Sequence, residues 1–281
     1  MAKFTSIIGN SQKLDGGAMF GNVPKTIWSQ WMMPDEKNRV TLACRALLIQ
    51  QDNKNILLET GIGAFFNPVL RERYGVMEED HILLQSLQKK GLSHTDIDFV
   101  ILSHLHFDHA GGLLSKWEDG KAATLLFPNA RYLVSQSNWE RACHPHPRDR
   151  ASFVPELNQL LAQSQRLVII ENETNDLLGQ HFRFMFTEGH TPGLMHTVFQ
   201  DNNQTVIFAS DLIPGLPWVH VPVSMGYDRS PECLIDEKKK MLEFAIKENA
   251  QVFYTHDPQH CMSRITQDEK GKFIPVDVIT G

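Results

Sequence analysis

Three histidines and one aspartate stand close together in the segment 103–112, which reads SHLHFDHAGG. The four residues are His104, His106, Asp108 and His109. Imidazole and carboxylate side chains suit a borderline divalent ion such as zinc, which they bind at roughly 2.0 to 2.2 Å. The residue types in this segment therefore predict a metal site.

The spacing of these residues allows them to serve two different centres. His104 and His106 are two residues apart, so both side chains point to the same side of an extended chain. Asp108 and His109 come after the chain has begun to turn, and the two glycines that follow allow a sharp turn and a close backbone approach. Four donors are too few for two ions, so the motif requires further ligands elsewhere.

Three further donors each follow an apolar stretch that has the character of a strand. His190 lies in the turn EGHTPG, Asp211 follows TVIFAS, and His256 follows VFYT. A single histidine in such a place more often has a structural role. The cluster at 103–112 is what favours a ligand role for His190 and His256. Seven donors at loop tips are enough for a dinuclear site.

Strands and helices must position these loops. The pattern predicts strands over 42–50, 55–58, 97–102, 130–135, 181–186, 196–200, 205–210 and 252–255, and helices over 78–90, 155–165 and 230–249. In the last helix Ser230 is expected to cap the first turn, where Pro231 and Glu232 also fit. Strands grouped with long helices indicate an α/β protein.

The motifs HLHFDHAGG, EGHTPG and SDLIP, with the strand-terminal His256, resemble those of the metallo-β-lactamase-fold hydrolases. The resemblance is greatest to the branch that holds N-acyl homoserine lactone lactonases and methyl parathion hydrolase, and it extends roughly over 42–258. The segment DGGAMFG at 15–21 also resembles an N-terminal loop of lactonase-like members. The resemblance implies a four-layer αββα sandwich. We expect a single domain over 1–281, with 1–40 as an N-terminal segment and loops near the active site.

The resemblance also implies a role for each donor. His104, His106 and His190 would hold a first metal ion, and Asp108, His109 and His256 a second, with Asp211 as the bridge between them. Both ions would be zinc. Asp108 would orient the attacking water and pass a proton to the leaving group. True β-lactamases of this fold usually place a cysteine near the bridging position, and this chain has none in that segment.

Two positions depart from the lactonase pattern. The best-known lactonases carry a tyrosine three residues after the bridging aspartate, where this chain has Pro214. We expect His220 or Tyr227 to take over the role of that tyrosine in holding the substrate, the alternative for each being ordinary loop packing. The superfamily usually has an aspartate at position 59, where it orients a ligand histidine, and this chain has the longer Glu59.

Aromatic and methionine side chains near the N-terminus and in one later loop are candidates for the substrate groove. They are Met19, Phe20, Trp28, Trp31, Met32, Met33, Phe65 and Phe66. Loops at the metal end of such a fold usually form the pocket, so these residues could line a groove for an acyl chain or an aryl ester. Packing in the core is an equal alternative, and a homodimer contact is a third.

Composition excludes several classes of function. The chain has 281 residues and 42% apolar residues, enough for a large core, and its net charge of −6 offers no basic patch for nucleic acid. No stretch approaches the roughly 20 apolar residues of a membrane span, and positions 1–10 lack a signal-peptide pattern. We expect a cytoplasmic protein without a membrane partner. The scattered cysteines, Cys44, Cys143, Cys233 and Cys261, are expected to be reduced thiols.

These observations favour a dinuclear metal-dependent hydrolase. The leading hypothesis is a lactonase or related ester hydrolase that acts on a small uncharged substrate similar to an acyl homoserine lactone. The alternative is a phosphotriester hydrolase of the methyl parathion hydrolase type. A non-hydrolytic metal protein of the same fold is the third hypothesis, and it is disfavoured because all seven donors are present.

Overall fold

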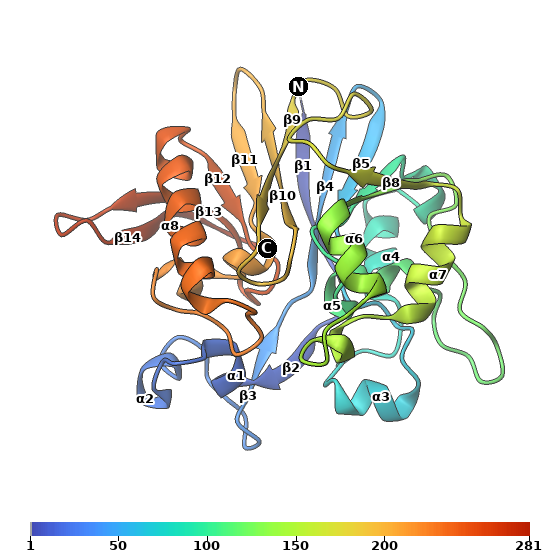
Figure 1. Cartoon of the computed structure of the whole chain (residues 1–281), viewed down its shortest axis with the longest axis horizontal. Helices are drawn as coiled ribbons and strands as arrows, with labels where there is room; N and C mark the ends of the chain where they lie inside the picture. Colours follow the sequence, from blue (N-terminus) through green and yellow to red (C-terminus); the bar gives the residue numbers. More distant parts are fainter. Residues whose placement is uncertain (1) are drawn as a thin grey trace. The chain divides into compact units, whose positions relative to one another are not determined.

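The computed structural model describes residues 2–281 and forms two compact units. The first unit comprises the residues up to Gln12 together with Ala43–Glu171, and the second comprises Lys13–Leu42 together with Asn172–Gly281. Each unit has its own six-stranded sheet (Figure 1). Within residues 2–281, no helix is both long and apolar enough to span a membrane.

The first unit has the strand order β1-β4-β5-β6-β7-β8. Its strands are β1 (Lys3–Ile8), β4 (Arg45–Gln51), β5 (Lys54–Leu58), β6 (Phe99–Ile101), β7 (Arg131–Ser135) and β8 (Leu167–Ile170). Its helices are α3 (Pro68–Arg73), α4 (Ile82–Lys89), α5 (Phe107–Ala110), α6 (Gln136–Cys143) and α7 (Pro155–Gln163), with short 3-10 turns η1 (His94–Asp96), η2 (Gly111–Leu113) and η3 (Arg150–Ser152). β1, β4 and β5 pair antiparallel, whereas β5 to β8 run parallel.

Apolar side chains on two helices fix the first unit's sheet. Leu83 and Leu87 of α4 and Leu157 of α7 belong to the same buried cluster as Val100 of β6. Such burial is the main favourable contribution to folding, at about 25 cal/mol per Å² of apolar surface. The predicted hairpin of β4 and β5 is confirmed, with a turn in which Asp52 and Asn53 both have positive φ, as tight hairpin turns require.

The second unit has the strand order β14-β13-β12-β11-β10-β9. Its strands are β9 (Phe182–Thr187), β10 (Leu194–Gln200), β11 (Thr205–Phe208), β12 (Gln251–Phe253), β13 (His260–Gln267) and β14 (Phe273–Thr280). A small sheet pairs β2 (Gln12–Asp15), whose first residue still belongs to the first unit, with β3 (Arg39–Leu42). Its helices are α1 (Gly16–Phe20), α2 (Lys25–Trp28) and α8 (Pro231–Lys247), with 3-10 turns η4 (Ser210–Leu212) and η5 (Leu216–Val219). Within the six-stranded sheet β11 and β12 pair in parallel, and the other neighbouring strands pair antiparallel.

Three of the residues proposed for the substrate groove lie in the core of the second unit. Phe20 stacks between Trp28 and Trp218, with ring centroids 5.4 and 4.7 Å away. Met19 belongs to the same buried cluster, which α8 joins through Leu234 and other side chains. For Met19, Phe20 and Trp28 the groove hypothesis is therefore wrong, and the alternative of core packing is confirmed.

Three sequence-based predictions of element ends need correction. The helix expected over 78–90 begins only at Ile82, because the carboxylate of Glu78 accepts hydrogen bonds from Ser11 and Asn10 Oδ1 accepts the backbone N–H of Ile82. The strand expected from position 42 begins at 45. Ser230 precedes α8, but its side chain makes no capping hydrogen bond; its backbone N–H donates to the carbonyl of Gly189 instead.

Candidate metal centre

Two parallel strands bring the polar residues of the first unit to one edge of its sheet. Glu59 directly follows β5, and Ser103 and His104 follow β6, so they meet at the carboxyl end where such sheets place their sites. The segment 103–112 that follows β6 then packs against the residues that follow β5. A Cβ atom on Gly112 would lie 2.1 Å from the carbonyl oxygen of Thr60, so this approach requires glycine.

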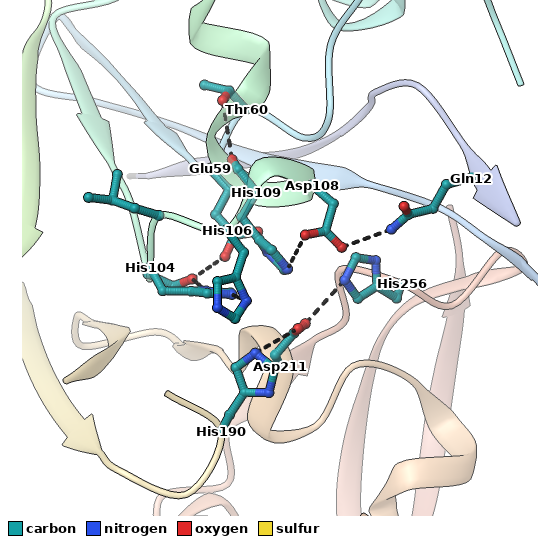
Figure 2. Close-up of polar contacts among 12 residues, drawn as sticks. Gln12, Glu59, Thr60, His104, His106, Asp108, His109, His190, Asp211 and His256 are labelled. Atoms are coloured by element: carbon teal, nitrogen blue, oxygen red, sulfur yellow. Dashed lines mark hydrogen bonds and ion pairs between the residues drawn. The ribbon is translucent and has the colours of Figure 1, made fainter. Parts of the chain in front are cut away.

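Glu59 links two of the predicted ligand histidines (Figure 2). Its Oε2 accepts a hydrogen bond from Nδ1 of His109 at 2.9 Å, and its Oε1 accepts one from the hydroxyl of Ser103. The Ser103 hydroxyl oxygen in turn lies 2.9 Å from Nδ1 of His104. With Nδ1 of both rings engaged as a donor, the Nε2 lone pairs of His104 and His109 are available to a ligand.

The remaining predicted ligands of the first unit lie in the same place. Nε2 of His104 and Nδ1 of His106 are 3.0 Å apart, and both rings are buried. His104, His109 and Glu59 each offer a ligand atom within 4.8 Å of the others. The structure thus brings together the histidines of the segment 103–112.

Asp108 is held from a direction that the sequence did not reveal. Its Oδ2 accepts a hydrogen bond of 2.8 Å from the side-chain amide of Gln12, which is completely buried (Figure 2). Its Oδ1 lies 3.7 Å from Nε2 of His109. Gln12 therefore fixes which way the Asp108 carboxylate is turned.

In the second unit three strands run in the same direction and end at one edge. β9 and β11 both pair antiparallel with β10, and β12 pairs in parallel with β11. His190, Asp211 and His256 each follow the carboxyl end of one of these strands. All three are buried, although their positions in the sequence are far apart.

The Asp211 carboxylate has one histidine at each of its two oxygens (Figure 2). Nε2 of His190 is 3.3 Å from Oδ2, and Nε2 of His256 is 3.1 Å from Oδ1. The backbone N–H of His256 donates to the carbonyl of Pro214, so the residue at the position of the lactonase tyrosine anchors the His256 loop.

Helix α8 supports the loop that carries His190. The carboxylate of Glu237 accepts the backbone N–H groups of Glu188 and Gly189 at 2.8 and 2.9 Å. Gly189 packs so closely on the helix that a Cβ atom there would lie 2.4 Å from the backbone of Leu234. On the other side of the ring, Nδ1 of His190 donates to Oδ1 of Asp228 at 2.9 Å.

His220 and Tyr227 have different surroundings within the second unit. His220 follows η5 and lines a cavity of about 670 Å³ together with Trp31, Met32 and Met33. Burial lowers the pKa of His220, and the positive charges of two lysines add to that shift. Tyr227 is 41% exposed and is not among the residues that line this cavity. The structure therefore groups His220, but not Tyr227, with part of the predicted groove.

A second cavity lies in the first unit beside the HxHxDH segment. It has a volume of about 450 Å³, and its wall includes Phe65, Phe66, Tyr74, Phe107 and Phe153. Phe107 stands between His106 and Asp108 in the chain, so this aromatic cavity adjoins the ligand loop. The predicted groove role of Phe65 and Phe66 agrees with their place in this wall.

The donors in both units fit a divalent metal ion. They are imidazoles and carboxylates, the ligands that zinc prefers, and all are buried except the partly buried Asp108. Three of the histidines have the second ring nitrogen engaged by a carboxylate or a hydroxyl, which is the usual support of a metal-binding imidazole. Burying so many polar groups in fixed orientations is costly, and a bound metal ion would offset this cost.

Sequence reasoning missed three residues that orient these donors. Ser103 and Gln12 gave no signal, because a serine before a histidine and a glutamine in an N-terminal strand are unremarkable without the fold. Asp228 stands three residues before the first residue of α8, outside the capping position held by Ser230, so helix-start signals do not single it out. Its proximity to Tyr227, a residue singled out for another reason, was the only available hint.

Comparison with known proteins identifies the family. Residues 39–266 match the metallo-beta-lactamase superfamily. N-acyl homoserine lactonase AiiA of Bacillus thuringiensis subsp. kurstaki is 27% identical over 75% of this chain and 79% of its own length. A probable metal-dependent hydrolase from Staphylococcus aureus has a similar structure, with a TM-score of 0.86 and 26% identity over 99% of this chain and 98% of that one.

A third similar protein is AidC, described as a dizinc quorum-quenching lactonase, whose structure matches with a TM-score of 0.73 over 98% of this chain and 94% of that one. At 24% identity it supports the fold alone. The matches agree with the predicted α/β metallo-β-lactamase fold class. The chain therefore belongs to the metallo-β-lactamase superfamily and is a metal-dependent hydrolase of that superfamily.

Proposed function

We propose that this protein is a dinuclear zinc hydrolase that opens lactones. The ligand set would be His104, His106 and His190 for one ion and Asp108, His109 and His256 for the other, with Asp211 shared. The placement of Asp211 is the observation that carries this proposal, because each of its oxygens faces a histidine assigned to a different ion. A carboxylate in that position is suited to bridging two ions.

The chemistry of the proposed reaction is the addition of water to a lactone carbonyl, followed by cleavage of the ring C–O bond to give a hydroxy acid. When bound, the metal pair would supply a water whose pKa is lowered towards about 7 and an electrophile for the carbonyl oxygen. Asp108, held by Gln12 through Oδ2, would take the proton of the attacking water and return it to the departing alkoxide oxygen. Glu59 would keep His104 and His109 in the tautomer that such a site requires.

An uncharged substrate with an apolar substituent agrees best with the surroundings. The cavity beside Phe107 has an aromatic wall and offers about 450 Å³, enough for an alkyl chain. Curated relatives named N-acyl homoserine lactonases and the dizinc lactonase AidC, crystallised with a homoserine product, support a lactone of this kind. We therefore propose an acyl homoserine lactone or a closely similar ester as the substrate.

The experiment is a substrate panel with the zinc-loaded protein in a pH-stat. It compares acyl homoserine lactones, aryl esters and phosphotriesters at equal concentration, with Asp211→Asn as the control that shows that turnover comes from this site. We expect the lactones to give the highest kcat/KM and the control to be inactive. Phosphotriester turnover well above lactone turnover would establish the phosphotriester hydrolase alternative instead, and no turnover of any of the three classes would overturn the proposal.

A further inference from the structure

Helix α8 buries a lysine inside the second unit. Lys238 is 0% exposed, and its ammonium group donates a hydrogen bond to the carbonyl of Val223. Lysine is almost never fully buried unless it is paired, because removing its charge from water is costly. Burial lowers the pKa of Lys238 to about 7, and the negative charge of Asp228 acts in the opposite direction. Asp228 is thus the acidic group that offsets the burial of this lysine.

Asp228 is itself buried, with 1% exposure, and both of its oxygens accept hydrogen bonds. Oδ2 accepts the backbone N–H of Met225 at 2.6 Å, and Oδ1 accepts Nδ1–H of His190 at 2.9 Å. The two residues that follow Asp228 also bind the same loop. Arg229 N–H donates to the carbonyl of His190 at 3.2 Å, and Ser230 N–H donates to that of Gly189 at 2.8 Å.

These contacts determine how His190 is presented. Because a carboxylate can only accept, Nδ1 of His190 must carry the proton, and the lone pair is on Nε2. Nε2 is the atom that faces Asp211, at 3.3 Å from Oδ2. A chain of three buried groups, Lys238, Asp228 and His190, therefore leads from α8 to the candidate bridging carboxylate.

We propose that Asp228 is a positioning residue for His190 and that Lys238, the buried basic group of α8 that acts on Asp228 by charge, helps to hold the Asp228 side chain in place. This inference rests on the proposed metal centre, in which His190 is a ligand through Nε2. In this account Lys238 does not contact the substrate and acts only through Asp228. The effect of replacing Lys238 should therefore depend on whether Asp228 is present.

The test measures zinc affinity by competition with a chromophoric chelator, in parallel with the unfolding midpoint of the zinc-free protein. The variants are Asp228→Asn, Lys238→Met and the double variant. Lys239→Met is the matched control, because Lys239 is the next residue of the same helix and is exposed. The double variant also removes the unpaired buried charge that Asp228→Asn leaves behind, so it provides a folded protein if the single variant is unstable.

We expect Asp228→Asn to weaken zinc binding about 10- to 100-fold, since an amide cannot accept from both His190 and Met225. Lys238→Met is expected to weaken binding less, and the double variant to bind no more weakly than Asp228→Asn alone. Lys239→Met should bind as the wild type does. A lowered unfolding midpoint with zinc affinity within twofold of wild type would reduce Asp228 to a structural residue and overturn the inference.

Two further outcomes separate the role of Lys238 from the existence of the metal centre. If Lys238→Met weakens zinc binding by the same factor in the Asp228→Asn background as alone, the lysine does not act through Asp228 and its assigned role is wrong. If the wild-type protein itself binds no zinc, the proposed centre fails and the inference fails with it. Wild-type binding of zinc with an unchanged Asp228→Asn variant would overturn the inference alone.

Discussion

Oε2 of Glu59 accepts a hydrogen bond from Nδ1 of His109 at 2.9 Å, although most superfamily members would place the shorter aspartate here. The backbone of Glu59 has a φ of 62°, in the left-handed region that non-glycine residues rarely adopt. Such a conformation costs on the order of 1 to 3 kcal/mol and is found where the surrounding structure determines it. The longer side chain thus reaches the histidine, and through Ser103 it also orients His104.

Glu59→Gln should therefore weaken zinc binding about 10- to 100-fold, the usual effect of removing the partner of a ligand histidine. The glutamine amide has one acceptor oxygen and cannot serve both Ser103 and His109. The measurement is chelator competition with the purified protein. Glu72→Gln, on the exposed side of α3, is the control and should have no effect. Unchanged affinity in Glu59→Gln would show that the hydrogen bond to His109 does not orient the ligand.

Gln12→Met tests the contact that fixes Asp108. Methionine has a similar length but no donor for Oδ2, and a hydrogen bond to a charged group contributes about 1.5 to 3 kcal/mol. We expect kcat to fall by about 10-fold or more while the zinc content stays that of the wild type. Gln12→Glu, which adds a negative charge beside Asp108, should lose more activity. Steady-state rates and elemental analysis check both variants, and an unchanged kcat in Gln12→Met would exclude a catalytic effect of this contact.

The candidate ligands could be chosen from the sequence because metal chemistry restricts residue types and spacing. His104, His106 and Asp108 alternate with apolar residues in one short segment, and the donors farther along each stand where an apolar stretch ends. The end of each strand can be recognised in the sequence by itself, without knowing which strand ends share an edge of the sheet. In the second unit β9, β11 and β12 are each followed by a polar candidate ligand. The predicted strands and long helices were largely confirmed, because each of them also has a local pattern of apolar residues.

The residues that orient the ligands could not be read in this way. Gln12 and Asp108 are 96 residues apart, and Asp228 is 38 residues from His190, so nothing local in the sequence marks either pair. The late start of α4 has the same origin, because Asn10 binds the first turn from 72 residues away. Local propensity also could not show that Phe20 and Trp28 would stack in the core rather than line a groove.

His220 and Tyr227 remain the two predicted replacements for the tyrosine at the position of Pro214. His220 lines a cavity, and its lowered pKa keeps it neutral at pH 7, so it can donate or accept a hydrogen bond. We expect His220→Ala to raise KM or lower kcat on the best substrate at least several-fold, and Tyr227→Phe to change neither by more than about twofold. Steady-state kinetics decide between them, and the reverse ranking would assign the role to Tyr227.

His81 predicts an acid-sensitive step in stability. Burial lowers its pKa from 6.5 to about 4, and its Nε2 lies 3.0 Å from the carbonyl of Gly112. Because the folded-state pKa is the lower one, the unfolded chain binds the proton more tightly between pH 6.5 and 4, and stability is lost as the pH falls through this window. Between pH 7 and pH 5 the expected loss is about 2 kcal/mol.

Urea unfolding of the zinc-free protein at pH 7 and pH 5 measures this loss. His81→Gln keeps a donor for Gly112 but does not titrate, so its stability should change less between the two pH values by about 2 kcal/mol. An identical pH dependence in the variant and in the wild type would show that other groups account for the acid sensitivity. The same comparison with His94→Gln, a histidine of η1 that is not buried, serves as the control.

The zinc content of the purified protein tests the central claim most directly. After loading with zinc and removal of excess metal, elemental analysis should give close to two zinc ions per chain for the wild type, and Asp211→Asn should lose most of that metal because both proposed sites share its carboxylate. A wild-type content of one ion or fewer, or a full complement in Asp211→Asn, would contradict the bridged dinuclear centre.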